Sequence, residues 1–302
     1  MPRIIALTGA TGFLGRHLVR DLLKQGFEVR ALVRRSGALD DLAHENLTIF
    51  DGDLASDLTG LASGADCLFH LAGLVKAPTW SEFEKVNIDG ARRVARAAET
   101  SKVARVILLS SQTARAPQLS RYARSKKMGE AAVREEFSGK LAVIRAPAVF
   151  GPGDDATKPI FNLMKRGYLP VAGGKDWSTR SAAMVYISDL VNNLIAMALE
   201  GEYDGKTVSP ATIGALTMPQ LAKYGEEALS RSVRAFPIPL IILYPVAAIT
   251  TLTLRLFSIG HLSLGKLAEF RYEHWQSNDL VSNPTPMAEA IAKTVQSYDA
   301  PG

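Results

Sequence analysis

Cysteine is almost absent from this chain: Cys67 is the single one in 302 residues. A lone cysteine excludes a disulfide within the chain and is typical of proteins kept in a reducing compartment. Because Cys67 falls in an apolar run, we interpret it as a core residue. The first predicted strand begins at Arg3 and leaves no room for a signal peptide, so we expect a cytoplasmic protein.

Basic tracts and internal repeats are also missing. The formal net charge is only +5, and no basic run is interleaved with aromatic side chains, which excludes the usual signature of nucleic-acid binding. A charge of this size is compatible with an anionic cofactor or with lipid headgroups. The hydrophobic fraction of 47% and the charged fraction of 22% are those of an ordinary globular protein. We assign no metal ligand.

Apolar runs alternate with segments of helical period through the first half of the chain. The predicted strands are 4–7, 27–33, 47–50, 67–71, 106–109 and 141–144, and the helical segments include 13–24, 83–100 and 122–137. This alternation predicts an α/β fold, a Rossmann-type doubly wound parallel sheet with a smaller C-terminal substrate-binding part.

The pattern loosens after about residue 150, and 185–199 again has the pattern of a strand and helix of the core sheet. We therefore place a nucleotide-binding domain at 1–150, with 185–210 returning to it. The substrate-binding part is expected at 151–184 and 211–302.

Three glycines lie at the junction of the first predicted strand and the first predicted helix. Gly9 allows a tight turn, Gly12 lets the backbone approach phosphate, and Gly15 lets the helix pack closely on the strand. Phosphates would then lie at the positive end of the helix. The turn predicts a dinucleotide site, with an ordinary tight turn as the alternative; its residues are Gly9, Thr11, Gly12, Phe13, Leu14 and Gly15.

The end of the second predicted strand indicates which dinucleotide binds. Enzymes that use NAD usually place an acid there for the ribose hydroxyls, whereas a 2′-phosphate calls for arginine. Arg34 and Arg35 stand at this point, with no acid. The sequence favours NADP(H) over NAD(H), and solvated loop arginines are the alternative.

Three polar residues are spaced for ketone or alcohol chemistry. Tyr122 and Lys126 lie four apart in a helical segment, so their side chains share a face. A nearby ammonium favours ionised Tyr122, which can exchange a proton with a substrate oxygen, and Lys126 can also hold the nicotinamide ribose. Ser111 ends a strand at the sheet edge where ligands bind, and we predict that it hydrogen-bonds the same oxygen. The alternatives are an exposed helix pair for Tyr122 and Lys126 and a strand-end cap for Ser111.

Several motifs together resemble the short-chain dehydrogenase/reductase superfamily, in the extended or atypical branch that includes nucleotide-sugar epimerases and 3β-hydroxysteroid dehydrogenases. The resemblance covers nearly the whole chain. It is carried by the segments 8–15, 52–54, 70–73, 86–90, 110–111, 122–126 and 145–154.

The resemblance implies roles for residues outside the glycine turn. Asp53 and Leu54 would contact the adenine, Leu71, Ala72 and Gly73 the ribose and phosphates, and Pro147 and Val149 the nicotinamide side. Asn87 would support a helix and a proton-relay water, with a helix cap or turn as the alternative. Ser111, Tyr122 and Lys126 match the catalytic residues.

Two departures weaken the nucleotide-sugar interpretation. Only ten residues separate Ser111 from Tyr122, too few for the long loop that usually covers the site in sugar epimerases. The arginine that helps hold a nucleotide diphosphate in those relatives is not reproduced around 179–189, where the spacing differs and an acid is missing. We interpret Asp189 as a structural residue that opens the following helix.

A long apolar block covers 236–259, and 236–254 contains no charge. Basic residues lie in or beside it: Arg231, Arg234, Arg255, Lys266 and Arg271. The block barely reaches the length of a membrane span, and we expect Pro245 to interrupt its helix. A core or dimer helix is one interpretation; the favoured one is a segment that dips into a membrane surface or lines a lipid channel. We expect 275–298 to form the closing helix of the superfamily.

These features predict an NADP(H)-dependent oxidoreductase that reduces a ketone or oxidises a secondary alcohol on a hydrophobic, lipid-like substrate. The sharpest interpretation is a keto-sphingolipid or ketoceramide reductase, and a sterol-like alcohol dehydrogenase comes next. A nucleotide-sugar epimerase or dehydratase and a non-catalytic NADP-binding subunit are the alternatives. Peripheral contact with the inner face of the cytoplasmic membrane and a homodimer are both compatible with the sequence.

Overall fold

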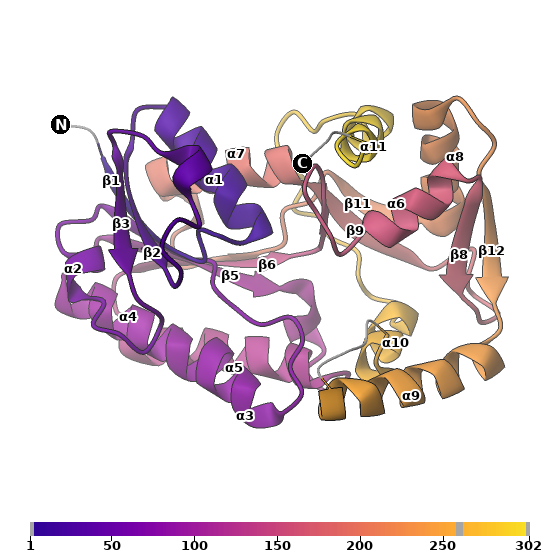
Figure 1. Cartoon of the computed structure of the whole chain (residues 1–302), viewed down its shortest axis with the longest axis horizontal. Coiled ribbons are helices and arrows are strands. Elements are labelled where there is room, and N and C mark those ends of the chain that lie inside the picture. Colours follow the sequence, from indigo (N-terminus) through magenta and orange to yellow (C-terminus); the bar gives the residue numbers. More distant parts are fainter. Residues whose placement is uncertain (1–2, 258–261, 300–302) are drawn as a thin grey trace. The chain divides into compact units, whose positions relative to one another are not determined.

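The computed structural model describes residues 3–257 and 262–299. The chain divides into two compact units (Figure 1). Unit 1 comprises Met1–Arg145 and Val191–Val208, and unit 2 comprises Ala146–Leu190 and Ser209–Gly302. The first division falls a few residues before the expected boundary at 150, because residues 148–150 pair with a strand of unit 2.

Unit 1 is built on a seven-stranded sheet. The strand order is β10-β6-β5-β4-β1-β2-β3, the order of a doubly wound dinucleotide-binding fold with one short strand added at the edge. Strand β1 pairs in parallel with β2 and β4, β2 with β3, β4 with β5, and β6 with β10. This parallel sheet confirms the predicted fold class. The strands are β1 (Ile4–Thr8), β2 (Glu28–Val33), β3 (Leu47–Asp51), β4 (Cys67–His70), β5 (Arg105–Ser111), β6 (Lys140–Ala146) and β10 (Thr207–Val208).

Helices cover both faces of this sheet (Figure 1). Its central strands are rich in Ile, Leu, Val and Ala because a parallel sheet is buried on both sides. Cys67 is buried in β4, and burial raises the pKa of its thiol to about 12, as fits a core residue. The helices are α1 (Phe13–Lys24), α2 (Thr59–Ala62), α3 (Trp80–Phe83), α4 (Gly90–Thr100), α5 (Arg121–Glu136) and α7 (Ile187–Leu199), the last of which begins in unit 2.

Unit 2 contains two small sheets and the remaining helices. One sheet has the order β11-β9-β7 and the other pairs β12 with β8. The elements are β7 (Ala148–Phe150), α6 (Lys158–Lys165), β8 (Tyr168–Ala172), β9 (Ser181–Tyr186), β11 (Ile213–Thr217), α8 (Met218–Leu229), β12 (Arg234–Ile238), α9 (Leu240–Phe257), α10 (Leu264–Arg271) and α11 (Met287–Gln296).

Three expectations for the C-terminal half were wrong. Strand β9 belongs to the three-stranded sheet rather than to the core sheet, and the strand that reaches the core sheet is β10. The closing helix is only Met287–Gln296, because Trp275 and Leu280 make β-bridges that hold the preceding segment extended. Pro245 does not interrupt α9: it lies in the second helical turn, where its missing N–H costs a single intrahelical hydrogen bond.

The apolar block forms β12 and α9 as far as Phe257, and its end at residue 259 lies outside the described residues. Within the described residues, no helix combines the length and apolar character that crossing a membrane requires.

Helix α5 carries two of the predicted catalytic residues, and its position depends on one glycine. It packs on the π-helical segment Glu84–Asp89 and on α4. A Cβ on Gly129 would collide with the carbonyl oxygen of Asn87, so only glycine allows this approach. At its other end α5 begins at the N-cap Ser120, whose hydroxyl accepts the Ala123 amide at 2.9 Å.

We expect Gly129→Ala to destabilise the protein. Alanine favours an isolated helix by about 1 kcal/mol over glycine. Forcing α5 away from Asn87 should reverse that gain and lower the free energy of unfolding by about 1–3 kcal/mol. Urea denaturation measures the change.

Met128→Ala, on the exposed side of the same helix, is the matched control and should shift stability by no more than about 0.5 kcal/mol. A Gly129→Ala variant as stable as the parent would show that α5 has room to spare at this contact.

Candidate active site

The glycine turn after β1 has the shape of a phosphate cradle. Gly9 has a φ of +81°, and a Cβ there would lie 2.5 Å from the Ala72 backbone nitrogen. A Cβ on Gly15 would collide with the Gly9 carbonyl oxygen, so α1 packs closely on the turn. The N-terminus of α1 has no side-chain cap and no acid in its first turn. An uncapped, acid-free helix end fits a pyrophosphate group.

The loop after β2 lies against the start of α1. Arg16 of α1 donates to the Ala38 carbonyl oxygen at 2.8 Å and pairs with Asp41. Arg34 and Arg35 are exposed in the same loop, and their side chains make no hydrogen bond or ion pair with the residues that the structure describes. Their guanidinium groups are therefore available to a ligand, whereas Arg16 is already engaged.

The end of β4 brings three predicted site residues together. A Cβ on Gly73 would lie 3.2 Å from Asn87 Oδ1 and 3.5 Å from Lys126 Nζ. Since Ala72 touches the glycine turn at Gly9, the predicted phosphate site and Lys126 lie along one continuous edge of the sheet. This is the carboxyl edge, where open α/β sheets bind their ligands.

Asn87 connects this edge to α5. Its Oδ1 accepts the Leu74 amide at 2.7 Å, and its Nδ2 donates to the Leu74 carbonyl at 2.9 Å and to Ser125 Oγ at 2.8 Å. Ser125 in turn donates to the Tyr122 carbonyl oxygen at 2.8 Å. The side chain is buried and both Nδ2 hydrogens are used, which matches the predicted helix-supporting role. The proton-relay water stays a prediction.

Lys126 contacts the end of β5, the strand that ends at Ser111. Lys126 Nζ donates to the Leu109 carbonyl oxygen at 2.7 Å, two residues before Ser111. Burial lowers the pKa of Lys126 to about 8, and the nearby Glu130 carboxylate opposes that shift. Ser111 Oγ accepts from the Thr113 amide at 3.2 Å and the Thr113 hydroxyl at 2.9 Å, so its own hydroxyl hydrogen can turn toward a ligand.

Tyr122 stands one turn before Lys126 on α5, beside Phe83, with ring centroids 6.4 Å apart. It is partly exposed, as a group that exchanges a proton with a ligand has to be. The joint action of Ser111, Tyr122 and Lys126 on one substrate oxygen stays a prediction.

A buried ion pair behind the site was missed by sequence reasoning. Glu130 accepts from Arg145 Nε at 2.8 Å, from Arg145 Nη2 at 2.7 Å and from Ser110 Oγ at 2.6 Å. Burial opposes ionisation of Glu130, but these hydrogen bonds outweigh it and lower its pKa. The spacing could have revealed this carboxylate, because Glu130 is four residues after Lys126 and therefore on the same face of the helix.

His70 is a second residue that sequence reasoning left without a role. At the end of β4 its Nδ1 lies 2.7 Å from Thr8 Oγ1, which ties β4 to β1 just before the glycine turn. Burial lowers the pKa of His70 to about 3, so the ring is neutral and acts as a hydrogen-bonding spacer.

The remaining predicted contacts fall into two groups. Asp53 follows β3, accepts the Ala55 amide at 2.8 Å and has a lowered pKa from that hydrogen bond. Leu54 lies against the start of α4, where a Cβ on Gly90 would come within 2.6 Å of it. Pro147 and Val149 belong to unit 2, and Val149 pairs with Val185. Contact of all four with a cofactor stays a prediction.

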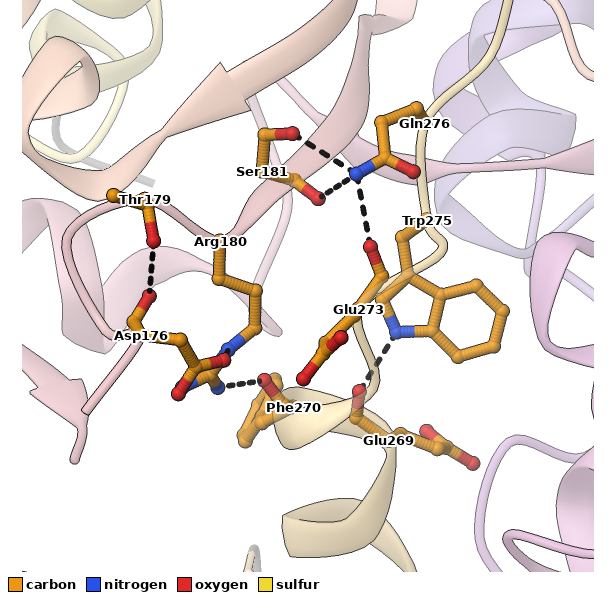
Figure 2. Close-up of polar contacts among 9 residues, drawn as sticks. All are labelled: Asp176, Thr179, Arg180, Ser181, Glu269, Phe270, Glu273, Trp275 and Gln276. Atoms are coloured by element: carbon orange, nitrogen blue, oxygen red, sulfur yellow. Dashed lines mark hydrogen bonds and ion pairs between the residues drawn. The ribbon is translucent and has the colours of Figure 1, made fainter. Parts of the chain in front are cut away.

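Each of the three guanidinium nitrogens of Arg180 in unit 2 makes a hydrogen bond within the protein (Figure 2). Its Nε and Nη2 bond the Asp176 carboxylate at 2.8 and 3.1 Å, and its Nη1 donates to the Phe270 carbonyl at 2.8 Å. An arginine bonded in this way is poorly placed to bind a nucleotide diphosphate.

Asp189 has the structural role expected for it. Its carboxylate accepts hydrogen bonds from the hydroxyls of Thr212 and Thr285, both at 2.6 Å.

The chain matches the model of the NAD dependent epimerase/dehydratase family over residues 5–208. It is 44% identical over 196 residues to a ceramide reductase of Caulobacter vibrioides, a match that covers 64% of this chain and 60% of that protein. It is 26% identical over 233 residues to a 3β-hydroxysteroid dehydrogenase/isomerase of Mycobacterium tuberculosis, covering 67% and 61%. The chain thus spans about three fifths of the length of these curated relatives.

Among solved structures, a UDP-glucuronic acid 4-epimerase from Bacillus cereus in complex with NAD superposes with a TM-score of 0.72 at 16% identity, over 98% of each chain. This likeness shows the fold. The family match confirms the resemblance drawn from the motifs, and a nicotinamide dinucleotide is the cofactor it supports.

We expect cofactor affinity to fall as the pH rises through about 8. The ammonium of Lys126 is present below its pKa and lost above it, and one unit above the pKa only about a tenth of the side chains stay charged. Titrating NADPH at several pH values between about 7 and about 9.5 should show a rising Kd.

Lys126→Arg keeps its charge over this range and should flatten the profile, whereas Lys127→Arg, on the exposed neighbour, should retain the parent profile. A Kd that does not change with pH in the parent protein would mean that the Lys126 ammonium takes no part in binding.

Proposed function

Because the chain belongs to the NAD dependent epimerase/dehydratase family, we propose that it is an NADP(H)-dependent ketoreductase of a long-chain lipid, with a 3-ketoceramide or 3-ketosphinganine as the substrate. The observation that carries the substrate class is the 44% identity to a ceramide reductase. The exposed apolar character of α9 supports a lipid-like substrate as well.

The proposed reaction follows from the residues at the carboxyl edge of the sheet. When bound, NADPH supplies the hydride for the carbonyl carbon. Tyr122 donates its hydroxyl proton to the carbonyl oxygen, and Ser111 donates a hydrogen bond to the same oxygen as negative charge develops on it. Lys126 stabilises the ionised Tyr122 through its positive charge and holds the nicotinamide ribose. In the reverse direction the same groups would oxidise a secondary alcohol.

NADP(H) is the proposed cofactor because of the two exposed guanidinium groups after β2. The guanidinium groups of Arg34 and Arg35 have no protein partner among the described residues, and a 2′-phosphate is the ligand that an arginine pair at this strand end would hold. No carboxylate stands at the strand tip to select the ribose hydroxyls of NAD.

A sterol-like alcohol dehydrogenase is the second candidate, favoured by the match to a 3β-hydroxysteroid dehydrogenase/isomerase. A nucleotide-sugar epimerase fits less well, because Arg180 is already hydrogen-bonded to the Asp176 carboxylate and the Phe270 carbonyl.

The location of the enzyme follows from the proposed substrate. A ketone that carries a long acyl chain resides in a bilayer, so we also propose a cytoplasmic enzyme that works as a peripheral protein at the inner face of the membrane.

We expect the purified protein to oxidise NADPH when supplied with 3-ketoceramide in detergent. Tyr122→Phe should lower kcat by about 100-fold or more, because it removes the proton donor from the transition state. The Kd for NADPH should change less than about twofold, since the hydroxyl is not needed to hold the phosphates.

Tyr224→Phe, a tyrosine of α8 in unit 2, is the control and should keep the parent kcat. If Tyr122→Phe turned over 3-ketoceramide at the parent rate, the proton donor would be another group. If the parent reduced a 3-ketosteroid and not 3-ketoceramide, the second candidate would replace the first.

Cofactor preference gives an independent prediction. The ratio of kcat/KM for NADPH over NADH should fall at least about tenfold in the double variant Arg34→Ala, Arg35→Ala, because a charge-assisted hydrogen bond contributes about 1.5–3 kcal/mol. Lys24→Ala, which removes an exposed charge elsewhere in unit 1, should leave the ratio unchanged. An unchanged ratio in the double variant would show that these arginines are merely solvated.

A further inference from the structure

Exposed apolar side chains are concentrated on one part of unit 2. Of the large hydrophobic side chains that the structure shows exposed, nine belong to β12, α9 and α10; we call these residues the α9–α10 surface. They are Phe236, Ile241, Ile242, Tyr244, Val246, Ile249, Leu252, Leu264 and Phe270. Single exposed hydrophobics are ordinary in soluble proteins, but a cluster of this size marks a surface that contacts something else.

Helix α9 is exposed around most of its circumference. Ile241, Ile249 and Leu252 are 82%, 63% and 57% exposed, and their spacing places them along one side of the helix. Ala247 is the fully buried residue among those of α9 whose side chains the structure describes. The helix packs along α10 and offers its remaining sides to the surroundings.

The α9–α10 surface is firmly attached to unit 2. Arg271 Nη1 donates to the Tyr244 hydroxyl at 2.7 Å and so joins α10 to α9. At the end of α10, Trp275 Nε1 donates to the Glu269 carbonyl at 2.7 Å, and Gln276 Nε2 donates to Ser181 Oγ at 3.0 Å (Figure 2). Together with the bond from Arg180 to the Phe270 carbonyl, these bonds join α9, α10 and the segment after α10 to the rest of unit 2.

The charges around the α9–α10 surface indicate what kind of partner it binds. The segment 231–273 contains five Arg or Lys residues and two Glu. Glu269 is buried and paired with Lys266 at 3.2 Å, so this pair adds no net charge. Among the other side chains that the structure describes in this segment, Arg231, Arg234 and Arg271 are exposed cations and Glu273 is the exposed acid. Apolar side chains with a basic rim are complementary to an anionic bilayer, where the side chains enter the acyl region and the cations meet lipid phosphates.

A second copy of the chain fits this surface less well. In a two-fold dimer the same surface is present on both partners, so the basic rims would face one another. A spanning helix is not required either, because an interfacial helix lies in the plane of the membrane.

We propose that the α9–α10 surface docks on an anionic lipid bilayer, with Ile241, Ile249 and Leu252 inserted below the headgroups. The docking does not depend on the identity of the substrate, and its test does not use NADPH oxidation. The proposal rests on the peripheral location proposed above and names the surface responsible. Its failure would remove that location and leave the ketoreductase activity standing, and loss of the activity would leave the docking standing.

Co-sedimentation with vesicles tests the proposal. The full chain should bind vesicles that contain phosphatidylglycerol and bind phosphatidylcholine vesicles more weakly. The triple variant Ile241→Ser, Ile249→Ser, Leu252→Ser should bind at least tenfold more weakly, and Arg234→Glu should weaken binding to the anionic vesicles alone. The matched controls Ile49→Ser, Leu280→Ser and Lys223→Glu alter exposed residues elsewhere and should bind as the parent does.

A fluorescence measurement covers the case in which the triple variant fails to fold. Cys67 is buried, so Ile249→Cys can be labelled selectively with an environment-sensitive dye. The dye on residue 249 should shift to the blue with anionic vesicles, and a dye on Ile49→Cys should not shift.

Absence of vesicle binding by the parent chain would overturn the proposal. So would parent binding with no shift of the dye at residue 249, or binding that survives the triple substitution in a folded protein. If the parent were instead a dimer that the triple variant dissociates, with no affinity for vesicles, the α9–α10 surface would be a subunit interface.

Discussion

The close approach of α5 to the Asn87 backbone is the contact on which the candidate active site depends. Gly129 permits this approach, and the Asn87 side chain then spans the distance from the loop after β4 to Ser125 on α5. Because Tyr122 and Lys126 are carried by the same helix, one packing contact positions both of the predicted catalytic side chains. Asn87 is buried within the π-helical segment Glu84–Asp89. Such local irregularities are frequent at functional sites.

Electrostatics at the site follow from the same packing. Burial disfavours the charge on Lys126, and the Glu130 carboxylate one turn away partly restores it. Glu130 can itself remain ionised in the interior because Arg145 and Ser110 hydrogen-bond to it. The neutral Thr8–His70 pair adds no charge at the neighbouring strand end. Lys126 is thus a cation at this edge of the sheet whose charge is lost as the pH rises through about 8. It lies close to where we propose that the dinucleotide and the substrate carbonyl meet.

The two units use apolar residues differently. In unit 1 the apolar strands and helix faces are buried in a common core, and the apolar side chains contribute to folding stability. In unit 2 the most apolar helix, α9, remains exposed. Because its apolar side chains are not buried, they contribute little to the free energy of folding. The proposed contact with lipid would account for both the exposure of α9 and the basic residues beside it.

The sequence by itself determined the alternation of strands and helices in unit 1, the glycine turn, and the helical spacing of Tyr122 and Lys126, because each depends on local periodicity or on a residue's own backbone preferences. It did not determine that β9 joins a separate sheet, that Pro245 is accommodated within α9, or that the segment after Trp275 is extended. Tertiary structure decided those, since strand partners and burial come from residues far apart in the chain. Glu130 and Arg145 show the same division: the spacing of Glu130 from Lys126 was visible in the sequence, but the buried ion pair exists only because β6 brings Arg145 alongside α5.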